Sequence, residues 1–206
     1  MLFFLFFAAL FAQCGWSTEF ISVLCKTSVG DIEITLRPDW SPSGAARFAE
    51  LVDDNFFENM LLYRALDGFL IQTGVAAKPE MNAKWSGKVL EDEPKKFQVG
   101  EWQAGMLSYA GAGPNSRDHH FFFTLSEEGT HINPHLGGEF HEVPFAEIVV
   151  GLDNLKKVFF GYGDDPLDLQ QTLQAEGNRV MLDKFPKLDR IHFCARQPPM
   201  EPEKEL

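Results

Sequence analysis

Residues 57–74 read FENMLLYRALDGFLIQTG, and this stretch decides the fold. It contains two apolar runs, Leu61–Tyr63 and Phe69–Thr73, with the turn residues Asp67 and Gly68 between them. Short apolar runs that are bounded by turn residues are typical of β-strands. We therefore expect two short strands here.

The sequence on either side continues the same pattern. Six further segments read as strands, and the Gly/Pro/Asn-rich residues 111–118 separate two of them. A helix is expected to begin at Ser41 and Pro42, because apolar residues recur behind them at intervals of three and four. A second helix is expected over residues 152–162. The six further strand segments are residues 20–26, 31–36, 105–110, 121–125, 143–150 and 188–195.

Many short strands with two helices favour a mainly β fold, a closed antiparallel barrel of eight strands capped by the two helices. The 206 residues are enough for one hydrophobic core, which 20 phenylalanines should dominate. Residues 76–97 and 164–178 read as irregular loops, and residues 179–184 fit neither class.

The two ends of the chain differ from this domain. Residues 2–12 form an unbroken apolar run followed by small and polar residues, which predicts a signal peptide over residues 1–18. The alternatives are an uncleaved membrane anchor formed by residues 2–12 and a buried N-terminal strand. Residues 19–196 then form the domain, and residues 197–206 form a disordered acidic tail. We expect a protein of the secretory pathway, in the endoplasmic reticulum lumen or secreted, with membrane contact only if the leader stays attached.

Charge and cysteine content exclude some functions. The net charge of −12 repels phosphate backbones, so we expect no nucleic acid partner. Cys25 and Cys194 lie in the first and last strands of the domain. We expect two buried free thiols, and a disulfide in an oxidising compartment is the alternative.

Five of the six histidines fall within residues 119–141, but their spacing does not predict a metal site. His131 and His135 are four residues apart, yet Pro134 prevents the helix that would align them. Gly111 and Gly113 begin a dinucleotide-binding motif in which Ser116 stands where the third glycine should be. We therefore expect no metal and no cofactor.

Two segments resemble the sequence motifs of the cyclophilins, in the family's order and spacing: residues 57–74 and residues 105–124, GMLSYAGAGPNSRDHHFFFT. The similarity runs from the first hairpin to the last strand. Residues 161–164, 174–178 and 185–189 resemble a C-terminal extension of a divergent cyclophilin subgroup of bacteria and algae. The resemblance implies a peptidyl-prolyl cis/trans isomerase that acts on Xaa-Pro segments of client proteins.

The resemblance also implies the site residues. Arg64 matches the arginine that hydrogen-bonds the twisted imide nitrogen in the transition state. Gln72 and Ala110 match residues that bind the substrate backbone. Phe69, Leu70 and Phe122 match the apolar surface that holds the proline ring, with Leu70 in place of a common methionine.

The other wall departs from the family pattern. His120 replaces a glutamine, Glu142 stands where a histidine is usual, with His141 beside it, and no tryptophan occurs at Leu136 or Gly137. We therefore expect weaker proline binding and reduced turnover. The alternative function is a non-catalytic cyclophilin-fold module that binds Pro-containing partners or serves as a subunit of a larger assembly.

Overall fold

The first two strands form the predicted hairpin, in which inward side chains alternate with partly exposed ones. The computed structural model describes residues 20–125 and 136–198, so the leader and most of the predicted tail lie outside the described residues. The strands are β1 (Ser22–Thr27), β2 (Ile32–Leu36), β3 (Met60–Leu61), β4 (Arg64–Leu66), β5 (Leu70–Thr73), β6 (Met106–Tyr109), β7 (Phe121–Thr124), β8 (Pro144–Val150) and β9 (Arg190–Arg196).

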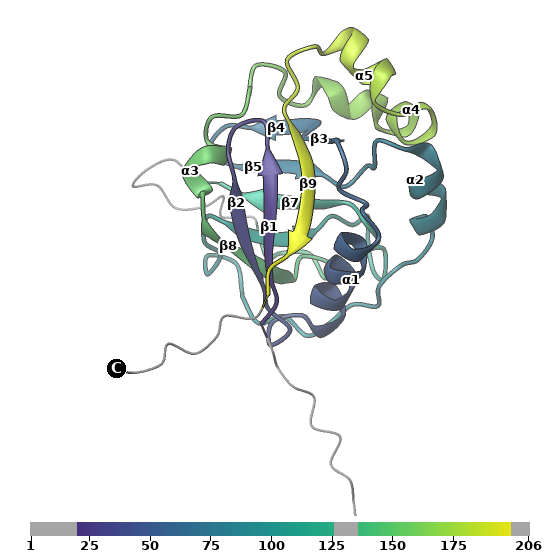
Figure 1. The fold of residues 1–206 in the computed structure, drawn as a ribbon. Coiled ribbons are helices and arrows are strands. Elements are labelled where there is room, and N and C mark those ends of the chain that lie inside the picture. Colours follow the sequence, from purple (N-terminus) through teal and green to yellow (C-terminus); the bar gives the residue numbers. More distant parts are fainter. Residues whose placement is uncertain (1–19, 126–135, 199–206) are drawn as a thin grey trace, which may run out of the picture.

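These strands form one antiparallel sheet that curls into a half-barrel (Figure 1). The order across the sheet is β3-β9-β1-β2-β8-β6-β7-β5-β4. The two edge strands, β3 and β4, are separated in the chain by Leu62 and Tyr63 alone, which forces the sheet to curl back on itself. The prediction of a mainly β antiparallel fold is confirmed. The sheet has nine strands instead of eight because β3 covers only the start of the run predicted over residues 61–63 and β4 was not predicted at all. No ladder joins these two edges within the described residues.

The predicted first helix is confirmed as α1 (Pro42–Asp53). The Ser41 hydroxyl accepts a hydrogen bond from the Gly44 N–H at 3.2 Å, and Pro42 occupies the first helical turn, where it needs no donor. The second predicted helix is wrong beyond its first turn, because α3 spans Leu152–Leu155 and the chain then turns toward β9. There the Phe159 N–H donates to Asp189 at 2.8 Å.

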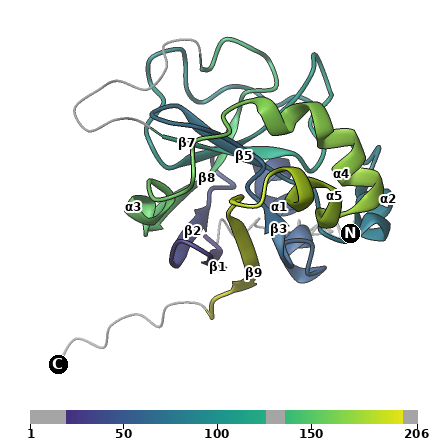
Figure 2. The same ribbon diagram turned by 90° about the horizontal axis from the view of Figure 1, so that it is seen from above.

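Four further short helical segments occur within the described residues. Each of these segments buries only one or two residues. None therefore has a repeat of apolar positions at helical spacing that the sequence could reveal. Figures 1 and 2 show α2, α4 and α5 together beside the sheet. The segments are α2 (Pro79–Trp85), the 3₁₀-helix η1 (Asp165–Leu169), α4 (Gln170–Glu176) and α5 (Asn178–Lys184).

The interior is rich in phenylalanine, as predicted. Phe48 of α1 packs against three other rings, with centroids 4.8 to 5.4 Å apart. A second cluster lies where α4 and α5 cover the edge of the sheet, and it includes Tyr63, Leu173 and Met181. The helical segment after residue 164 is therefore held by packing of its own. The three partners of Phe48 are Phe57, Phe121 and Phe145.

Cys25 and Cys194 form a disulfide, so the expectation of two free thiols is wrong. The two residues are directly opposite on the neighbouring strands β1 and β9, with Cα atoms 4.0 Å apart. Antiparallel pairing of the first and last strands therefore brings the sulfurs together, which the sequence alone did not fix.

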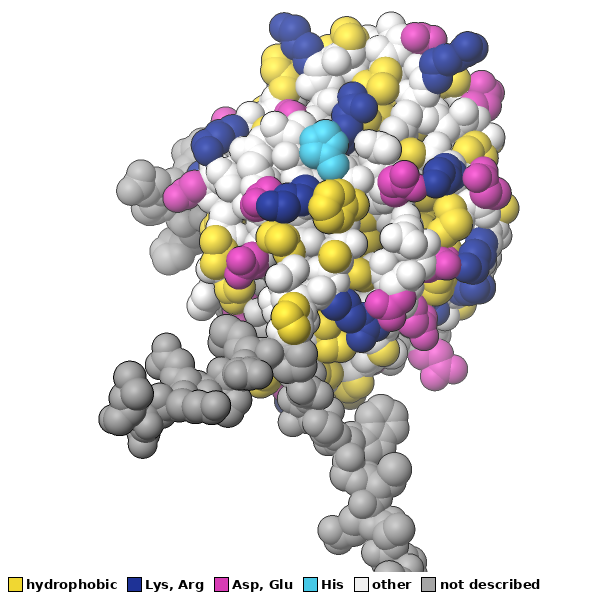
Figure 3. Space-filling view, in the orientation of Figure 1, with side chains coloured by type: hydrophobic (Ala, Val, Ile, Leu, Met, Phe, Trp, Pro, Cys, Tyr) yellow, Lys and Arg dark blue, Asp and Glu magenta, His cyan; other side chains and the backbone are white. Residues whose placement is uncertain are grey.

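On the face seen in Figure 3, Lys and Arg side chains are interspersed with Asp and Glu and do not gather into one basic patch. None of the helices in residues 20–125 and 136–198 is both long and apolar enough to cross a membrane.

Reduction of the disulfide should lower the free energy of unfolding by about 2–5 kcal/mol, because the crosslink restricts the unfolded chain over a long loop. The crosslinked residues are 169 positions apart. Denaturant unfolding with and without dithiothreitol measures the change. A double variant, Cys25→Ser with Cys194→Ser, should not respond to the reductant. An unchanged midpoint for the reduced wild-type protein would contradict the assignment.

Candidate active site

Three side chains lie in a row across neighbouring strands. Arg64 of β4 is directly opposite Gln72 of β5, and Gln72 is directly opposite Phe122 of β7. Opposite residues of an antiparallel pair point to the same face of a sheet. Their chain neighbours Ile71 and Phe123 point to the other face and are fully buried in the core. The row therefore lies on the outer face of the curled sheet.

A nearly buried apolar patch adjoins the row, and its members are each only 4–6% exposed: Leu70, Trp102, Met106, Phe122 and Leu136. Phe69 and Ala110, two of the predicted substrate-binding residues, pack against it and are partly exposed. Of the predicted apolar side chains, Leu70 and Phe122 lie within the patch itself. The structure thus brings Phe69, Leu70, Ala110 and Phe122 together beside Arg64 and Gln72.

Trp102 is a candidate site residue that the sequence did not reveal. Its indole stacks on the ring of Phe122, with centroids 6.2 Å apart and 11° between the planes. A Cβ added at Gly137 would lie 2.6 Å from the indole Nε1, so the indole rests against the position where the resemblance implied a tryptophan. The loop before β6 therefore supplies the aromatic ring that the segment around Gly137 lacks. A single tryptophan between Glu101 and Gln103 gave no periodic signal.

Arg64 makes two hydrogen bonds that fix its guanidinium. Its Nε donates to Asp164 at 2.6 Å, and its Nη1 donates to the Gln72 side-chain oxygen at 2.9 Å. Its Nη2 has no partner among the described residues, and the side chain is 21% exposed. A charged donor is therefore held in place and left available.

From Arg64 a chain of hydrogen bonds runs across the site to Asp118. Because the Asp118 carboxylate only accepts, His120 carries its proton on Nδ1, and its Nε2 accepts from Gln170. Every link then points in the same direction, from a cation to an anion. The links are Arg64 Nη1 to Gln72 Oε1 at 2.9 Å, Gln72 Nε2 to Tyr63 Oη at 3.1 Å, Tyr63 Oη to Gln170 Oε1 at 3.1 Å, Gln170 Nε2 to His120 Nε2 at 3.3 Å and His120 Nδ1 to Asp118 Oδ1 at 3.0 Å.

The surroundings of Tyr63 and Asp118 shift the pKa values of these two members of the hydrogen-bond chain. Burial raises the pKa of Tyr63, so its hydroxyl keeps the proton that it donates. Burial alone would raise the pKa of Asp118, but the hydrogen bonds that its carboxylate accepts from His120 outweigh burial and lower that pKa. The carboxylate at the end of the chain therefore stays ionised.

The opposite wall is built differently from the expectation. Both hydrogen bonds of Glu142 go to a turn, since its Oε2 accepts from the N–H groups of Gly137 at 2.8 Å and Glu139 at 3.0 Å. Glu142 thus holds the turn that carries Gly137. The ring of His141 lies against Gly111, where an added Cβ would come within 2.6 Å of its Cγ. Because Gly111 directly follows Ala110 in the chain, His141 borders the site on the side of Ala110.

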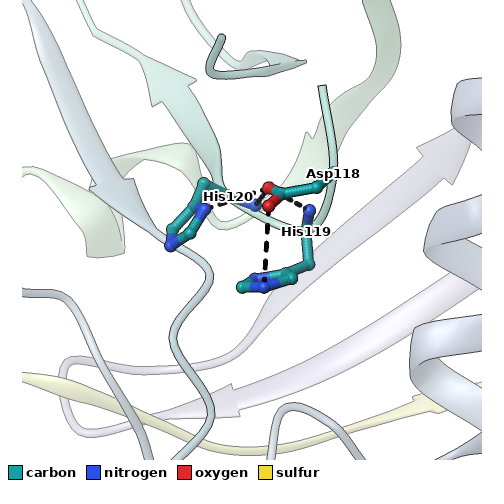
Figure 4. Close-up of side chains that lie close together, drawn as sticks. All are labelled: Asp118, His119 and His120. Atoms are coloured by element: carbon teal, nitrogen blue, oxygen red, sulfur yellow. Dashed lines mark hydrogen bonds and ion pairs between the residues drawn. The ribbon is translucent and has the colours of Figure 1, made fainter. Parts of the chain in front are cut away.

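Asp118, His119 and His120 are the one group within the described residues that could hold a metal ion, with ligand atoms within 4.8 Å of each other (Figure 4). The hydrogen bond between Asp118 and His120 occupies one atom of each. His119 Nδ1 donates to the Gly74 carbonyl at 2.6 Å, and its buried Nε2 has no hydrogen-bond partner among the described residues. The contacts of Asp118 and His120 are explained without a metal.

Comparison with known proteins places the chain in a family. The sequence model of the family described as cyclophilin type peptidyl-prolyl cis-trans isomerase/CLD matches residues 22–169. A peptidyl-prolyl cis-trans isomerase of Arabidopsis thaliana is 32% identical over 155 residues, which cover 71% of this chain and 89% of the relative. The human peptidyl-prolyl cis-trans isomerase-like 3 is 29% identical over 140 residues, 67% of this chain and 81% of the relative.

The chain belongs to the cyclophilin-type peptidyl-prolyl cis-trans isomerases.

Solved structures agree on the fold of this cyclophilin. A cyclophilin type isomerase of Cryptosporidium parvum superposes with a TM-score of 0.59 at 22% identity, over 89% of this chain and 99% of the other. A second structure of that protein, obtained in the presence of the dipeptide ala-pro, gives a TM-score of 0.58 over 86% of this chain and 99% of the other. The match to the family model ends at Leu169, so α4, α5 and β9 lie beyond it.

The neutral state of buried His119 predicts a pH dependence of stability. Burial lowers the pKa of His119 below its ordinary value of 6.5. Below pH 6.5 the unfolded chain therefore takes up a proton that the folded protein does not, and the unfolding free energy falls by up to about 1.4 kcal/mol per pH unit.

Urea unfolding between pH 7.5 and pH 5 measures this loss. The variant His119→Asn keeps a donor for the Gly74 carbonyl and has no titrating ring, so its curve should be flatter over this range. Parallel curves for the two proteins would show that His119 does not carry the effect.

Proposed function

We propose that this cyclophilin isomerises Xaa-Pro bonds of client proteins with Arg64 as the catalytic residue. The observation that carries the proposal is the row of Arg64, Gln72 and Phe122 on one face of the sheet, with no partner for Arg64 Nη2 among the residues that the structure describes. The row combines a cation, an amide and an aromatic ring. These are the groups that an Xaa-Pro segment needs beside its imide nitrogen, its backbone and its proline ring.

The chemistry follows from the resonance of the amide bond. Rotation about the imide bond has a barrier of about 18–20 kcal/mol, because the nitrogen lone pair is conjugated with the carbonyl group. In the twisted transition state the nitrogen regains a basic lone pair. An N–H of Arg64 donated to that lone pair makes a hydrogen bond that the planar ground states cannot make. Such an interaction lowers the barrier instead of merely tightening binding.

The neighbouring groups orient the substrate. The proline ring would lie on the apolar patch, whose Phe122, Leu70 and Trp102 are 4–6% exposed, beside the partly exposed Phe69 and Ala110. Gln72 uses one N–H and one lone pair in bonds to described residues, and its second N–H, which has no partner in that part of the chain, would donate to a substrate carbonyl. The comparison structure obtained with ala-pro supports binding of an Xaa-Pro dipeptide by this fold. No bond is made or broken, so the reaction requires no cofactor.

Substitution Arg64→Ala should lower kcat/KM for a proline peptide by about a hundredfold, as expected for loss of one charged transition-state donor. A protease-coupled assay measures the rate. The control is Arg179→Ala, since Arg179 is an exposed arginine of α5 far along the chain from the row. Equal rates for Arg64→Ala and the wild-type protein would leave a binding module without catalysis.

We also propose that this isomerase assists folding in the secretory pathway. The Cys25–Cys194 disulfide supports an oxidising compartment, since disulfides between structural strands are rare in reducing ones. The apolar run of residues 2–12 supports entry by a signal peptide. Protein isolated from its source should therefore begin near residues 13–18. An intact Met1 in a membrane fraction would favour an anchor instead.

A further inference from the structure

The segment from Asp164 to Gln170 reaches the site at two points. Asp164 contacts Arg64, and Gln170 contacts both Tyr63 and His120 in the hydrogen-bond chain. Asp164 is 100 residues from its partner in sequence, and Gln170 is 107 residues from Tyr63. Gln170 begins α4, which lies beyond the range that the family model matches. The segment from Asp164 to Gln170 therefore contributes side chains to the site, although the family model ends within it, at Leu169.

The backbone fixes Asp164 beside Arg64. Gly163 forms an antiparallel bridge with Ala65, the residue that follows Arg64. Gly163 adopts a φ of +53°, a conformation that favours glycine, and its N–H donates to the Phe160 carbonyl at 3.1 Å. The carbonyl of Asp164 then accepts from the N–H of Leu167 in η1 at 2.9 Å. Asp164 is thus set by a turn that is hydrogen-bonded on both sides.

Stability does not explain the ion pair. The Asp164 side chain is 62% exposed, and exposed ion pairs contribute about 0–1 kcal/mol to folding. The segment is held instead by the buried cluster that includes Leu173, Met181 and Phe185. Removal of the Asp164 carboxylate should therefore leave the fold in place.

Orientation does explain it. A guanidinium has five N–H donors in one plane on a flexible stem, so a single contact leaves it free to swing. Gln72 of β5 accepts from Nη1, and Asp164, in the turn before η1, accepts from Nε. Two contacts at separate nitrogens, from two separate elements, fix both the position and the plane of the group. The unpartnered Nη2 then has one direction.

From this geometry we infer that Asp164 is a positioning residue of the isomerase reaction, which orients Arg64 so that its free N–H meets the imide nitrogen. The inference rests on the proposed role of Arg64. The lost interaction would be felt in the transition state, because that is where the orientation of the donor matters, and much less in peptide binding.

The test compares Asp164→Ala, Asp164→Asn and Asp165→Ala. Asp164→Ala should lower kcat/KM by about tenfold with the peptide Kd unchanged within about twofold, since a misdirected donor affects turnover. Asp164→Asn keeps an oxygen acceptor for Arg64 Nε and should recover most of the rate. Asp165→Ala removes the same charge one residue away, from an exposed side chain, whereas the described hydrogen bonds of Arg64 are with Asp164 and Gln72, so this variant should match the wild-type protein. Exchange spectroscopy by NMR gives turnover, and a chemical-shift titration gives the Kd.

A double-mutant cycle separates this inference from the proposed function. If Arg64→Ala is impaired and Asp164→Ala lowers its residual rate no further, Asp164 acts through Arg64. An Asp164→Ala protein that is as active as the wild type, or more active, overturns the positioning role while Arg64 remains catalytic. A wild-type rate for Arg64→Ala overturns both. Thermal unfolding of each variant confirms that the fold is retained.

Discussion

The site depends on the register of three short strands. A shift of one residue between β4 and β5 would turn either Arg64 or Gln72 to the other face, because side chains alternate along a strand. The register is held from the core side, where Ile71, Phe121 and Phe123 are fully buried and point away from the row. Packing of phenylalanine in the interior therefore determines which polar groups meet outside. Catalysis and folding share one constraint.

The hydrogen-bond chain extends this constraint from strands to helices. Its links share one direction from the Arg64 cation to the Asp118 carboxylate, and chains of this kind strengthen their members by polarisation. Both Gln72 and Tyr63 are held at two points, so the row is rigid without a covalent link. The segment from Asp164 to Gln170 contacts Arg64 through Asp164, and Tyr63 and His120 through Gln170.

Much of the fold and of the row could be predicted from the sequence. The cap at Ser41 and the first hairpin gave clear local signals. The motif of residues 57–74 singled out Phe69 and Gln72, and the motif of residues 105–124 singled out Phe122. Contacts between distant segments gave none: Asp164 and Gln170 lie in short helical turns with few buried residues, and Trp102 lies in a loop. Pairing of Cys25 with Cys194 required the order of strands in the sheet, which local patterns do not contain. Glu142 was expected on the substrate-binding wall because it stands where the family has a histidine, whereas its described side-chain bonds hold a turn.

The central claim is that one guanidinium N–H is kept free beside an apolar patch and faces the imide nitrogen. A crystal structure of the protein with a bound Xaa-Pro peptide tests it most directly. The account predicts the proline ring against Phe122 and Trp102, with Arg64 Nη2 directed at the imide nitrogen and Nε still bonded to Asp164. A peptide bound elsewhere on the sheet, or an Arg64 side chain turned away from a proline ring seated on Phe122, would contradict it.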